Sequence, residues 1–270
     1  MVTWSPGQCG YWARVCECDY GHAFAKELKC GREWCPTCGQ DWSDVHKQRF
    51  ARWLPKAQTY QVMGLLVITI PPSIRFRFRS KSELRRFRRG VVRALKRMGY
   101  NRGLTRFHWF GDRHPGVFHP HLNILIERGR IPPRELKRLK LMAERHVGMP
   151  CVVHYSYTRS PKKMVHWLKY ITRATFTDYT WDEDMADELY RFNNCHSWGK
   201  WDGLTPRWVL PKSMAKLDGL RRLEMGLCPI CGCNLHWYGG LDKTSDLSRL
   251  GFKPYVAGWW FKDIPRSPPP

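Results

Sequence analysis

Residues 117–126, VFHPHLNILI, decide the fold class, because apolar and polar side chains alternate along them as in a β-strand with one buried face. The even-numbered positions, except Pro120, are apolar and can face a core. The other face of the strand carries polar side chains: His119, His121 and Asn123. Two imidazoles on one face could hold a single divalent cation.

The segment before this strand predicts its partner in a hairpin. Residues 105–112, TRFHWFGD, also alternate, and RHPG at 113–116 predicts a turn. His108 and Asp112 share one face of this arm, so either could reach the cation as a third ligand. We favour Asp112, because Mg²⁺ and Mn²⁺ are hard cations that prefer oxygen.

Further elements surround the hairpin. The apolar run at 64–70 ends at two prolines and predicts a central strand, and residues 152–158 predict another. Helical spacing of apolar residues predicts helices at 82–98, 132–146 and 161–174.

The composition indicates a nucleic-acid partner. Lys and Arg outnumber Asp and Glu 46 to 23, a net charge of +23, and the chain also has 14 Trp, 11 Tyr and 12 Phe. Cations neutralise phosphates and aromatic faces stack on unpaired bases, so a single-stranded nucleic acid is the leading candidate. The expected DNA contacts, on the helix at 82–98 and on the histidine strand, are Arg85, Arg89, Arg93 and Asn123. No apolar run of about 18 residues occurs, so a membrane partner is not expected.

Eleven cysteines cluster toward the two ends of the chain. No secretory signal is visible, so we expect a cytoplasmic protein in which cysteines bind metal rather than form disulfides. The knuckle CPTC at 35–38 predicts a first structural zinc. Its expected ligands are Cys35, Cys38 and Cys30, with Cys16 or Cys18; spacing leaves Cys9 and His22 open.

A second knuckle, CPIC at 228–231, predicts a second zinc. Its expected ligands are Cys228, Cys231, Cys233 and His236. The pair Cys195-His196 is the alternative source of the other two ligands.

The helix at 161–174 places a tyrosine among cations. Its apolar stripe consists of Met164, Trp167, Leu168 and Ile171, and its polar side carries His166, Lys169, Tyr170 and Arg173. A phenol has a pKa near 10, so it needs nearby positive charge or metal assistance to act as a nucleophile.

The order of these motifs resembles that of the single-tyrosine HUH endonucleases, and most closely the rolling-circle replication initiators of plasmids and phages. The strand LVIT at 66–69, the motif HPH at 119–121 and KYITR at 169–173 match the three motifs of that family. The segment at 30–38, CGREWCPTC, looks like the cysteine segment that often precedes the first motif in plasmid initiators.

The resemblance implies an α+β fold: a central antiparallel sheet of four or five strands with helices on one face, flanked by zinc-binding modules. It implies that Mg²⁺ or Mn²⁺ on His119 and His121 polarises a phosphate of single-stranded DNA at an origin hairpin. Tyr170 would attack it, giving a 5′-phosphotyrosine link and a free 3′-OH, with Lys169 and Arg173 supplying charge. A host helicase and polymerase would be partners, since no Walker A loop occurs.

Two positions depart from the family pattern. Some initiators have Glu four residues before the tyrosine, where this chain has His166, so His166 or a second subunit would serve termination. Arg173 replaces the usual Lys.

The sequence predicts three consecutive segments and leaves two alternatives to the initiator function. The segments are a zinc module at 1–58, an endonuclease domain at 59–178 and a C-terminal region with the second zinc knuckle and a disordered tail at 179–270. The alternatives to an initiator are a single-strand transposase or relaxase of the same chemistry, and a non-catalytic zinc-ribbon protein that binds nucleic acid.

Overall fold

The chain forms two compact units. The computed structural model describes residues 9–112, 116–242 and 244–263. The histidine unit is Lys56–Val209, and the cysteine unit joins Met1–Pro55 to Leu210–Pro270. This division differs from the three consecutive segments expected from the sequence, because both cysteine-rich ends belong to one unit and residues 179–209 belong to the other.

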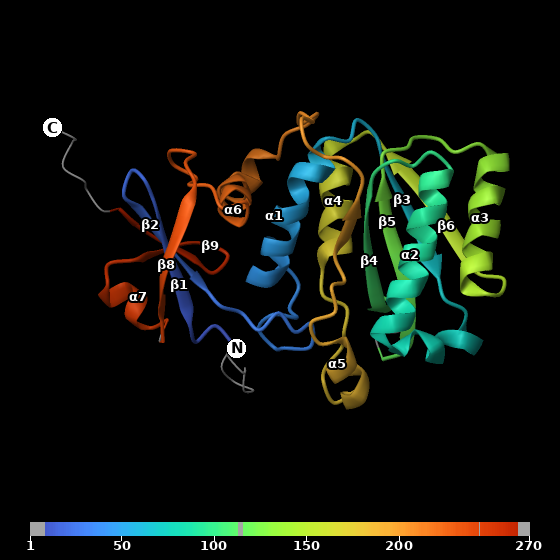
Figure 1. Cartoon of the computed structure of the whole chain (residues 1–270), viewed down its shortest axis with the longest axis horizontal. Coiled ribbons are helices and arrows are strands. Elements are labelled where there is room, and N and C mark those ends of the chain that lie inside the picture. Colours follow the sequence, from blue (N-terminus) through green and yellow to red (C-terminus); the bar gives the residue numbers. More distant parts are fainter. Residues whose placement is uncertain (1–8, 113–115, 243, 264–270) are drawn as a thin grey trace. The chain divides into compact units, whose positions relative to one another are not determined.

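An antiparallel five-stranded sheet forms the centre of the histidine unit, in the order β6-β3-β5-β4-β7 (Figure 1). Its strands are β3 Met63–Thr69, β4 Gly103–Phe110, β5 Phe118–Ile126, β6 Val152–Thr158 and β7 His196–Trp198. The four predicted strands are confirmed with small shifts of their bounds, and the short β7 was not predicted. Most of the turn expected at 113–116 lies outside the described residues.

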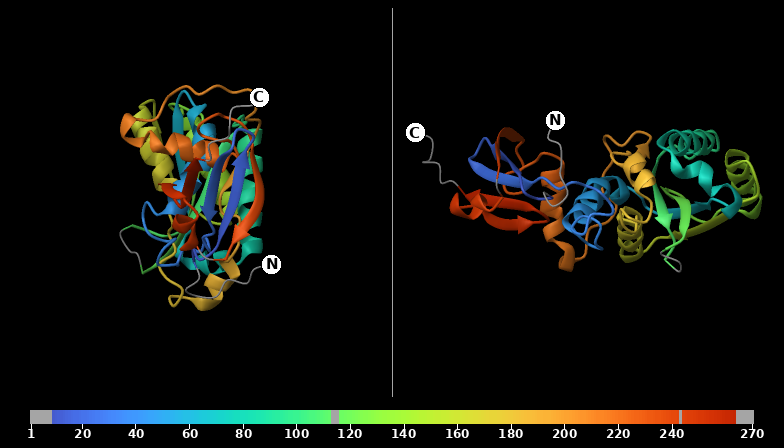
Figure 2. Two further views of the ribbon diagram at one scale, coloured as in Figure 1. Left: turned by 90° about the vertical axis from the view of Figure 1, so that its left-hand side faces the viewer. Right: turned by 90° about the horizontal axis from the view of Figure 1, so that it is seen from below.

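Helices lie on both faces of this sheet (Figures 1 and 2). Helices α2, Lys81–Arg97, and α3, Pro133–Val147, cover one face, where Phe87 of α2 contacts Phe107 of β4 with ring centroids 6.2 Å apart. Helix α4, Pro161–Thr172, lies against β4 on the other face, where it contacts His108. The α+β class is confirmed, and α4 adds a helix to the face that carries the histidines.

Local sequence explains where the helices begin and end. The Ser80 hydroxyl accepts a hydrogen bond from the Glu83 backbone N–H and caps α2. Proline occupies the first turn of α3 and of α4, where no backbone N–H is needed. Helix α3 ends at Gly148, whose φ of 90° suits glycine.

Strand β4 is buried along its whole length, although its sequence alternates. The reason is tertiary: α2 covers one face, α4 covers part of the other, and β7 pairs along its edge. Gly103 makes this edge possible, since a Cβ there would lie 2.1 Å from the ring of Trp198. The 3-10 helix η1, Pro72–Arg79, and helix α5, Glu183–Leu189, complete the unit.

A second antiparallel five-stranded sheet forms the cysteine unit, in the order β8-β1-β2-β10-β9. Its strands are β1 Ala13–Cys18, β2 His22–Glu27, β8 Leu235–Leu241, β9 Lys253–Val256 and β10 Trp259–Asp263. One hydrophobic cluster of its core consists of Ala13, Val15, Ala23, Ala25, Leu247 and Phe252. Helices α6, Lys216–Glu224, and α7, Asp246–Arg249, and the 3-10 helix η2, Lys212–Met214, also lie in this unit.

Helix α1, Asp44–Gln58, begins in the cysteine unit and ends in the histidine unit. Among the described residues, no helix has the length and apolar character needed to cross a membrane.

Candidate functional site

One face of the central sheet gathers the polar side chains predicted on β4 and β5. His121 pairs with His108 on one side and with Thr69 on the other. Asn123 pairs in the same way with Arg106 of β4. Residues directly opposite in an antiparallel pair point to the same face, so these side chains share one surface, which we call the histidine face.

The two histidines of the HPH motif lie close together on the histidine face. Their ring centroids are 5.6 Å apart. The Nδ1 of His121 lies 2.9 Å from the His119 carbonyl, and because a carbonyl only accepts, this nitrogen carries the proton. Burial lowers the pKa of His121 to about 4. At neutral pH His121 is therefore uncharged with Nε2 as the nitrogen available to a metal, which is the arrangement of many metal-ligating histidines.

His108 lies between the HPH motif and helix α4. Its ring centroid is 5.3 Å from that of His121 and 5.0 Å from that of Tyr170. It is completely buried, and its Nε2 donates to the Ile171 carbonyl at 3.1 Å. Burial lowers its pKa well below 6.5. The alternation of residues 105–112 was the signal that placed His108 here; its full burial could not be read from that alternation.

Tyr170 lies on the histidine face, half-buried, one residue before the carbonyl that His108 binds. The guanidinium carbon of Arg173 is 4.5 Å from the centre of the Tyr170 ring. Burial raises the pKa of Tyr170, and the positive charge of Arg173 opposes that rise. The phenol is therefore protonated at neutral pH, and a phosphate substrate approaching it would meet a cation.

Asp112 forms an ion pair with Arg173. Its carboxylate accepts a hydrogen bond from the Arg173 guanidinium. Its negative charge also acts on His121, whose pKa it raises against the larger effect of burial. Asp112 thus lies near both the HPH motif and Tyr170, and its role as third metal ligand stays a prediction.

Two donors from β4 hold the end of helix α4. The last carbonyls of a helix have no partner within the helix. His108 binds the carbonyl of Ile171, and the Nη2 of Arg106 donates to the carbonyl of Arg173 at 3.1 Å. Arg106 is only 2% exposed, so its hydrogen bond to the Arg173 carbonyl is shielded from solvent. Together the two contacts fix α4 on the sheet with Tyr170 over His108.

The other predicted site residues differ in how far they are exposed. His166 is exposed on α4, and Lys169 is partly exposed. Asn123 lies on the histidine face but is completely buried, and neither its Oδ1 nor its Nδ2 has a hydrogen-bond partner among the described residues. Its expected contact with DNA is therefore corrected, because an amide with no exposed surface cannot reach a bound strand.

The three predicted arginines of α2 are on the other side of the sheet from Tyr170. Helix α2 packs on the face of Phe107, whereas Tyr170 contacts the neighbouring residue His108. Successive residues of a strand point to opposite faces. Arg85, Arg89 and Arg93 therefore cannot belong to the Tyr170 site.

The first cysteine cluster consists of Cys9, Cys30, Cys35 and Cys38, whose four sulfurs lie within 4.8 Å of one another. The Sγ of Cys38 is 3.2 Å from that of Cys9 and 3.7 Å from that of Cys30. Zinc–sulfur bonds of about 2.3 Å give a tetrahedron with edges of about 3.8 Å. The cluster is therefore consistent with a structural zinc site.

The second cluster joins both ends of the chain: Cys18, His22, Cys228 and Cys231. The Sγ of Cys18 lies 3.3 Å from Nδ1 of His22 and 3.5 Å from the Sγ of Cys231. This set is also consistent with a structural zinc site. Such a site would bind the β1–β2 turn to the CPIC knuckle more than two hundred residues later, which accounts for the discontinuous unit.

The expected ligands of the first zinc are corrected at two positions. Cys16 is completely buried at a bulge of β1, where it pairs with Phe24 and Trp237. Its thiol belongs to neither of the two Cys/His clusters, so it is not a ligand of either. Cys18, two residues later, lies at the end of β1 and belongs to the second cluster, while Cys9 completes the first.

The expected ligands of the second zinc are corrected too. Cys233 closes the knuckle through its backbone, because its carbonyl accepts from the Cys228 N–H at 2.7 Å, and its thiol is not in the cluster. His236 lies 3.4 Å from Asp19 instead. Cys195 and His196 belong to the histidine unit, where the Sγ of Cys195 is 3.2 Å from Arg106.

Comparison of the chain with protein-family models, with curated proteins and with solved structures found no match.

Proposed function

We propose that the histidine unit is a metal-dependent endonuclease of the single-tyrosine HUH type, which cuts and rejoins single-stranded DNA. The observation that carries the proposal is the chain of ring contacts from the HPH motif through His108 to Tyr170. Centroid separations of 5.6, 5.3 and 5.0 Å place candidate metal ligands and a candidate nucleophile on one face.

The chemistry follows from the residues at this site. His119 and His121, with Asp112 as the proposed third ligand, would hold Mg²⁺ or Mn²⁺, which would supply positive charge beside the scissile phosphate. The Tyr170 oxygen forms a bond to phosphorus as the bond from phosphorus to the 3′ oxygen breaks. The phenolic proton passes to solvent water, and the departing 3′ oxygen takes up a proton from solvent. One phosphodiester replaces another, so the strand can later be rejoined without ATP.

Arg173 has a defined part in this proposal. Its guanidinium lies against the Tyr170 ring and would stabilise both the phenolate and the added charge on the phosphate. Its contact with Asp112 and the contact of Arg106 with its carbonyl hold it there. Within this chemistry we favour a rolling-circle replication initiator, working with a host helicase and polymerase, over a single-strand transposase or relaxase.

The two cysteine clusters favour a second candidate function, a non-catalytic zinc protein that binds nucleic acid. Under that hypothesis the histidine face would be a packed polar layer with no reaction. The two candidates differ in whether a covalent adduct forms.

The test is a search for that adduct. The protein is incubated with a pool of random single-stranded oligonucleotides labelled at the 3′ end, with and without added Mg²⁺ or Mn²⁺, and separated on a denaturing gel. We expect a labelled protein band that needs the added metal and vanishes in Tyr170→Phe. Sequencing of the trapped strand would give the cleavage site.

The matched control is Tyr157→Phe. Tyr157 is 45% exposed on β6 and, by its pairing with Gly64, faces away from the histidine face. This variant should form the adduct as the unmodified protein does. A zinc-loaded, folded protein that gives no adduct with any strand, or whose adduct survives Tyr170→Phe, contradicts the proposal.

A further inference from the structure

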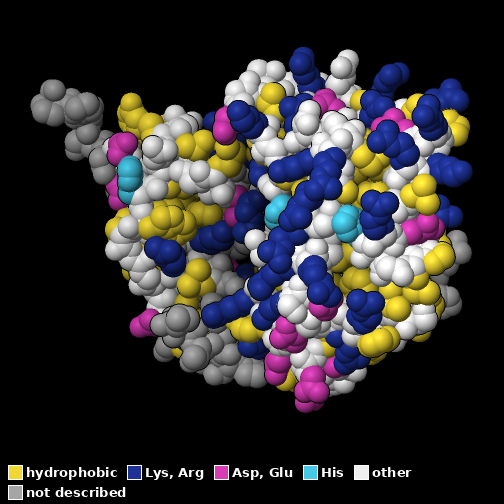
Figure 3. All heavy atoms as spheres, turned by 45° about the vertical axis from the view of Figure 1, so that its right-hand side comes forward, with side chains coloured by type: hydrophobic (Ala, Val, Ile, Leu, Met, Phe, Trp, Pro, Cys, Tyr) yellow, Lys and Arg dark blue, Asp and Glu magenta, His cyan; other side chains and the backbone are white. Residues whose placement is uncertain are grey.

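A groove lies between helix α2 and strand β7, on the side of the sheet away from Tyr170. It has a volume of about 650 Å³ and is lined by α2 and by residues 196–199. Figure 3 shows Lys and Arg side chains gathered over the face that carries α2. The cationic side chains lining this groove are Arg85, Arg88, Arg89, Arg93 and Lys96.

The walls of the groove are held together by a buried arginine. Arg88 is 6% exposed, and its Nη1 donates to the carbonyls of Asn193 and Asn194 at 2.7 and 3.2 Å. Asn194 in turn bonds the backbone N–H and carbonyl of Phe107 on β4. The segment leading into β7 is thereby fixed to α2, so the groove is a built feature of the fold.

The charge in the groove is not neutralised by the protein. Helix α2 has eight Lys or Arg residues and a single acid, Glu83, which pairs with Arg86. Within the part of the chain that the structure describes, no carboxylate forms an ion pair with Arg85, Arg89, Arg93 or Lys96. Like charges one helical turn apart repel, so this row costs stability until an anion binds it.

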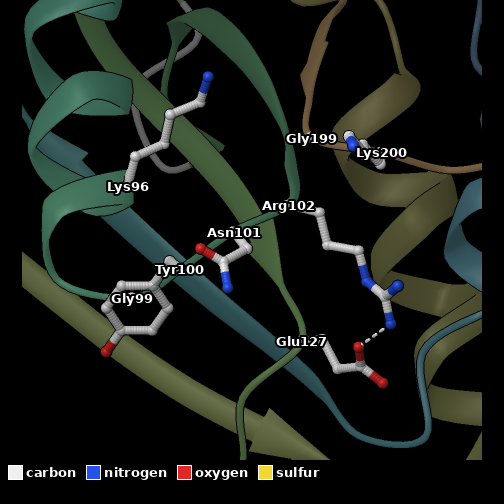
Figure 4. Close-up of a pocket in the computed structure, with 8 residues that line it drawn as sticks. All are labelled: Lys96, Gly99, Tyr100, Asn101, Arg102, Glu127, Gly199 and Lys200. Atoms are coloured by element: carbon white, nitrogen blue, oxygen red, sulfur yellow. Dashed lines mark hydrogen bonds and ion pairs between the residues drawn. The ribbon is translucent and has the colours of Figure 1, made fainter.

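A second hollow of about 810 Å³ continues the groove, since Lys96 and Gly199 line both (Figure 4). It adds Arg102, which pairs with Glu127, and Lys200. Gly199 has a φ of +96°, and a Cβ there would meet the Asn101 carbonyl at 2.4 Å. Glycine is therefore needed to bring the loop carrying Lys200 this close to the sheet.

The lining favours duplex over single-stranded nucleic acid. Sites for single strands combine cations with exposed aromatic rings that stack on bases. Among the described residues that line the two hollows, the Tyr and Trp residues are Tyr100 and Trp198, which are only 6% and 5% exposed. Their rings are therefore too buried to stack on bases. The cations from Arg85 to Lys96 extend over about 16 Å of helix, which corresponds to about five base pairs.

We propose that this groove binds the phosphate backbone of duplex DNA. The inference deepens the proposed function, because it assigns the nuclease a substrate in which a duplex segment flanks the single strand that Tyr170 attacks. The two binding sites lie on opposite faces of one sheet. Backbone contacts would position the DNA, and the strand would reach the histidine face past the sheet edge.

The test measures the binding of a fluorescein-labelled 20-base-pair duplex by anisotropy over a range of salt concentrations, without added Mg²⁺. Each phosphate contact contributes about 0.9 to the slope of log affinity against log salt. The double variant Arg89→Gln/Arg93→Gln should therefore lower the slope by about 1.8 and weaken duplex binding about 30-fold at 0.15 M salt. Both arginines are exposed, so the helix should fold normally, which circular dichroism checks.

The matched control is Arg134→Gln/Arg138→Gln, an exposed pair with the same spacing on α3, outside the groove. It removes the same charge and should change duplex affinity less than threefold. The proposal is overturned if both double variants weaken binding equally, if a 20-nucleotide single strand loses as much affinity as the duplex, or if an RNA duplex binds more tightly than DNA.

The duplex assay is independent of the nuclease assay. Tyr170→Phe should bind the duplex as the unmodified protein does, and Arg89→Gln/Arg93→Gln should still form the covalent adduct with a short single strand. Failure of the adduct with intact duplex binding would reject the proposed chemistry alone. Failure of duplex binding with an intact adduct would reject the groove alone.

Discussion

Replacement of His108 by glutamine should remove a pH dependence from the stability of the histidine unit. His108 is completely buried, and burial lowers its pKa well below 6.5. In the unfolded chain it titrates near 6.5, so below that pH the unfolded state binds a proton that the folded state does not. The unfolding free energy must therefore fall as the pH decreases from about 6.5.

The magnitude follows from proton linkage. One such group costs about 1.4 kcal/mol per pH unit, which amounts to about 2 kcal/mol between pH 6.5 and pH 5. The amide nitrogen of glutamine can still donate to the Ile171 carbonyl that His108 binds at 3.1 Å. Above pH 7 we therefore expect the variant to be less stable by about 1 kcal/mol, and near pH 5 to be the more stable of the two.

The assay is urea unfolding followed by fluorescence at half-unit steps from pH 5 to pH 8, for both proteins, without added Mg²⁺. Zinc ligands and other groups also titrate in this range, but they are the same in both proteins and cancel in the difference. Two stability curves that stay parallel below pH 6.5 would refute the reasoning, because His108 would then take up its proton in the folded state.

Two further predictions concern a zinc cluster and the buried amide. Cys231→Ser should reduce the zinc content from two ions to one per chain, because Cys231 belongs to the second cluster. Mass spectrometry of the metal measures this content. The control is Cys233→Ser, two residues away and outside the cluster, which should keep both ions. Asn123→Leu should raise the unfolding free energy by about 1–3 kcal/mol, because it removes a buried amide that has no hydrogen-bond partner among the described residues; a melting temperature that falls would contradict this account.

The sequence by itself determined the elements of the histidine unit and the content of its site. Alternation with period two identified β4 and β5, a short apolar run stopped by two prolines identified β3, and residues 152–158 were also predicted as a strand, β6. Helical spacing identified α2, α3 and α4, and each of these patterns depends only on near neighbours in the chain. The same alternation placed His119 and His121 on one face. Spacing along α4 separated Tyr170 from the apolar stripe, and two CxxC knuckles indicated metal binding.

Only the tertiary structure decided which distant groups meet. Ligand sets join residues from both ends of the chain, and local spacing says nothing about such pairs, so Cys18 was assigned to the wrong cluster and Cys9 was left open. The same holds for β7, three residues long, which exists because β4 offers it an edge. The burial of Asn123 and the position of α2 on the far side from Tyr170 depend on how helices cover a sheet, and that is set by packing across the whole unit rather than by any one segment.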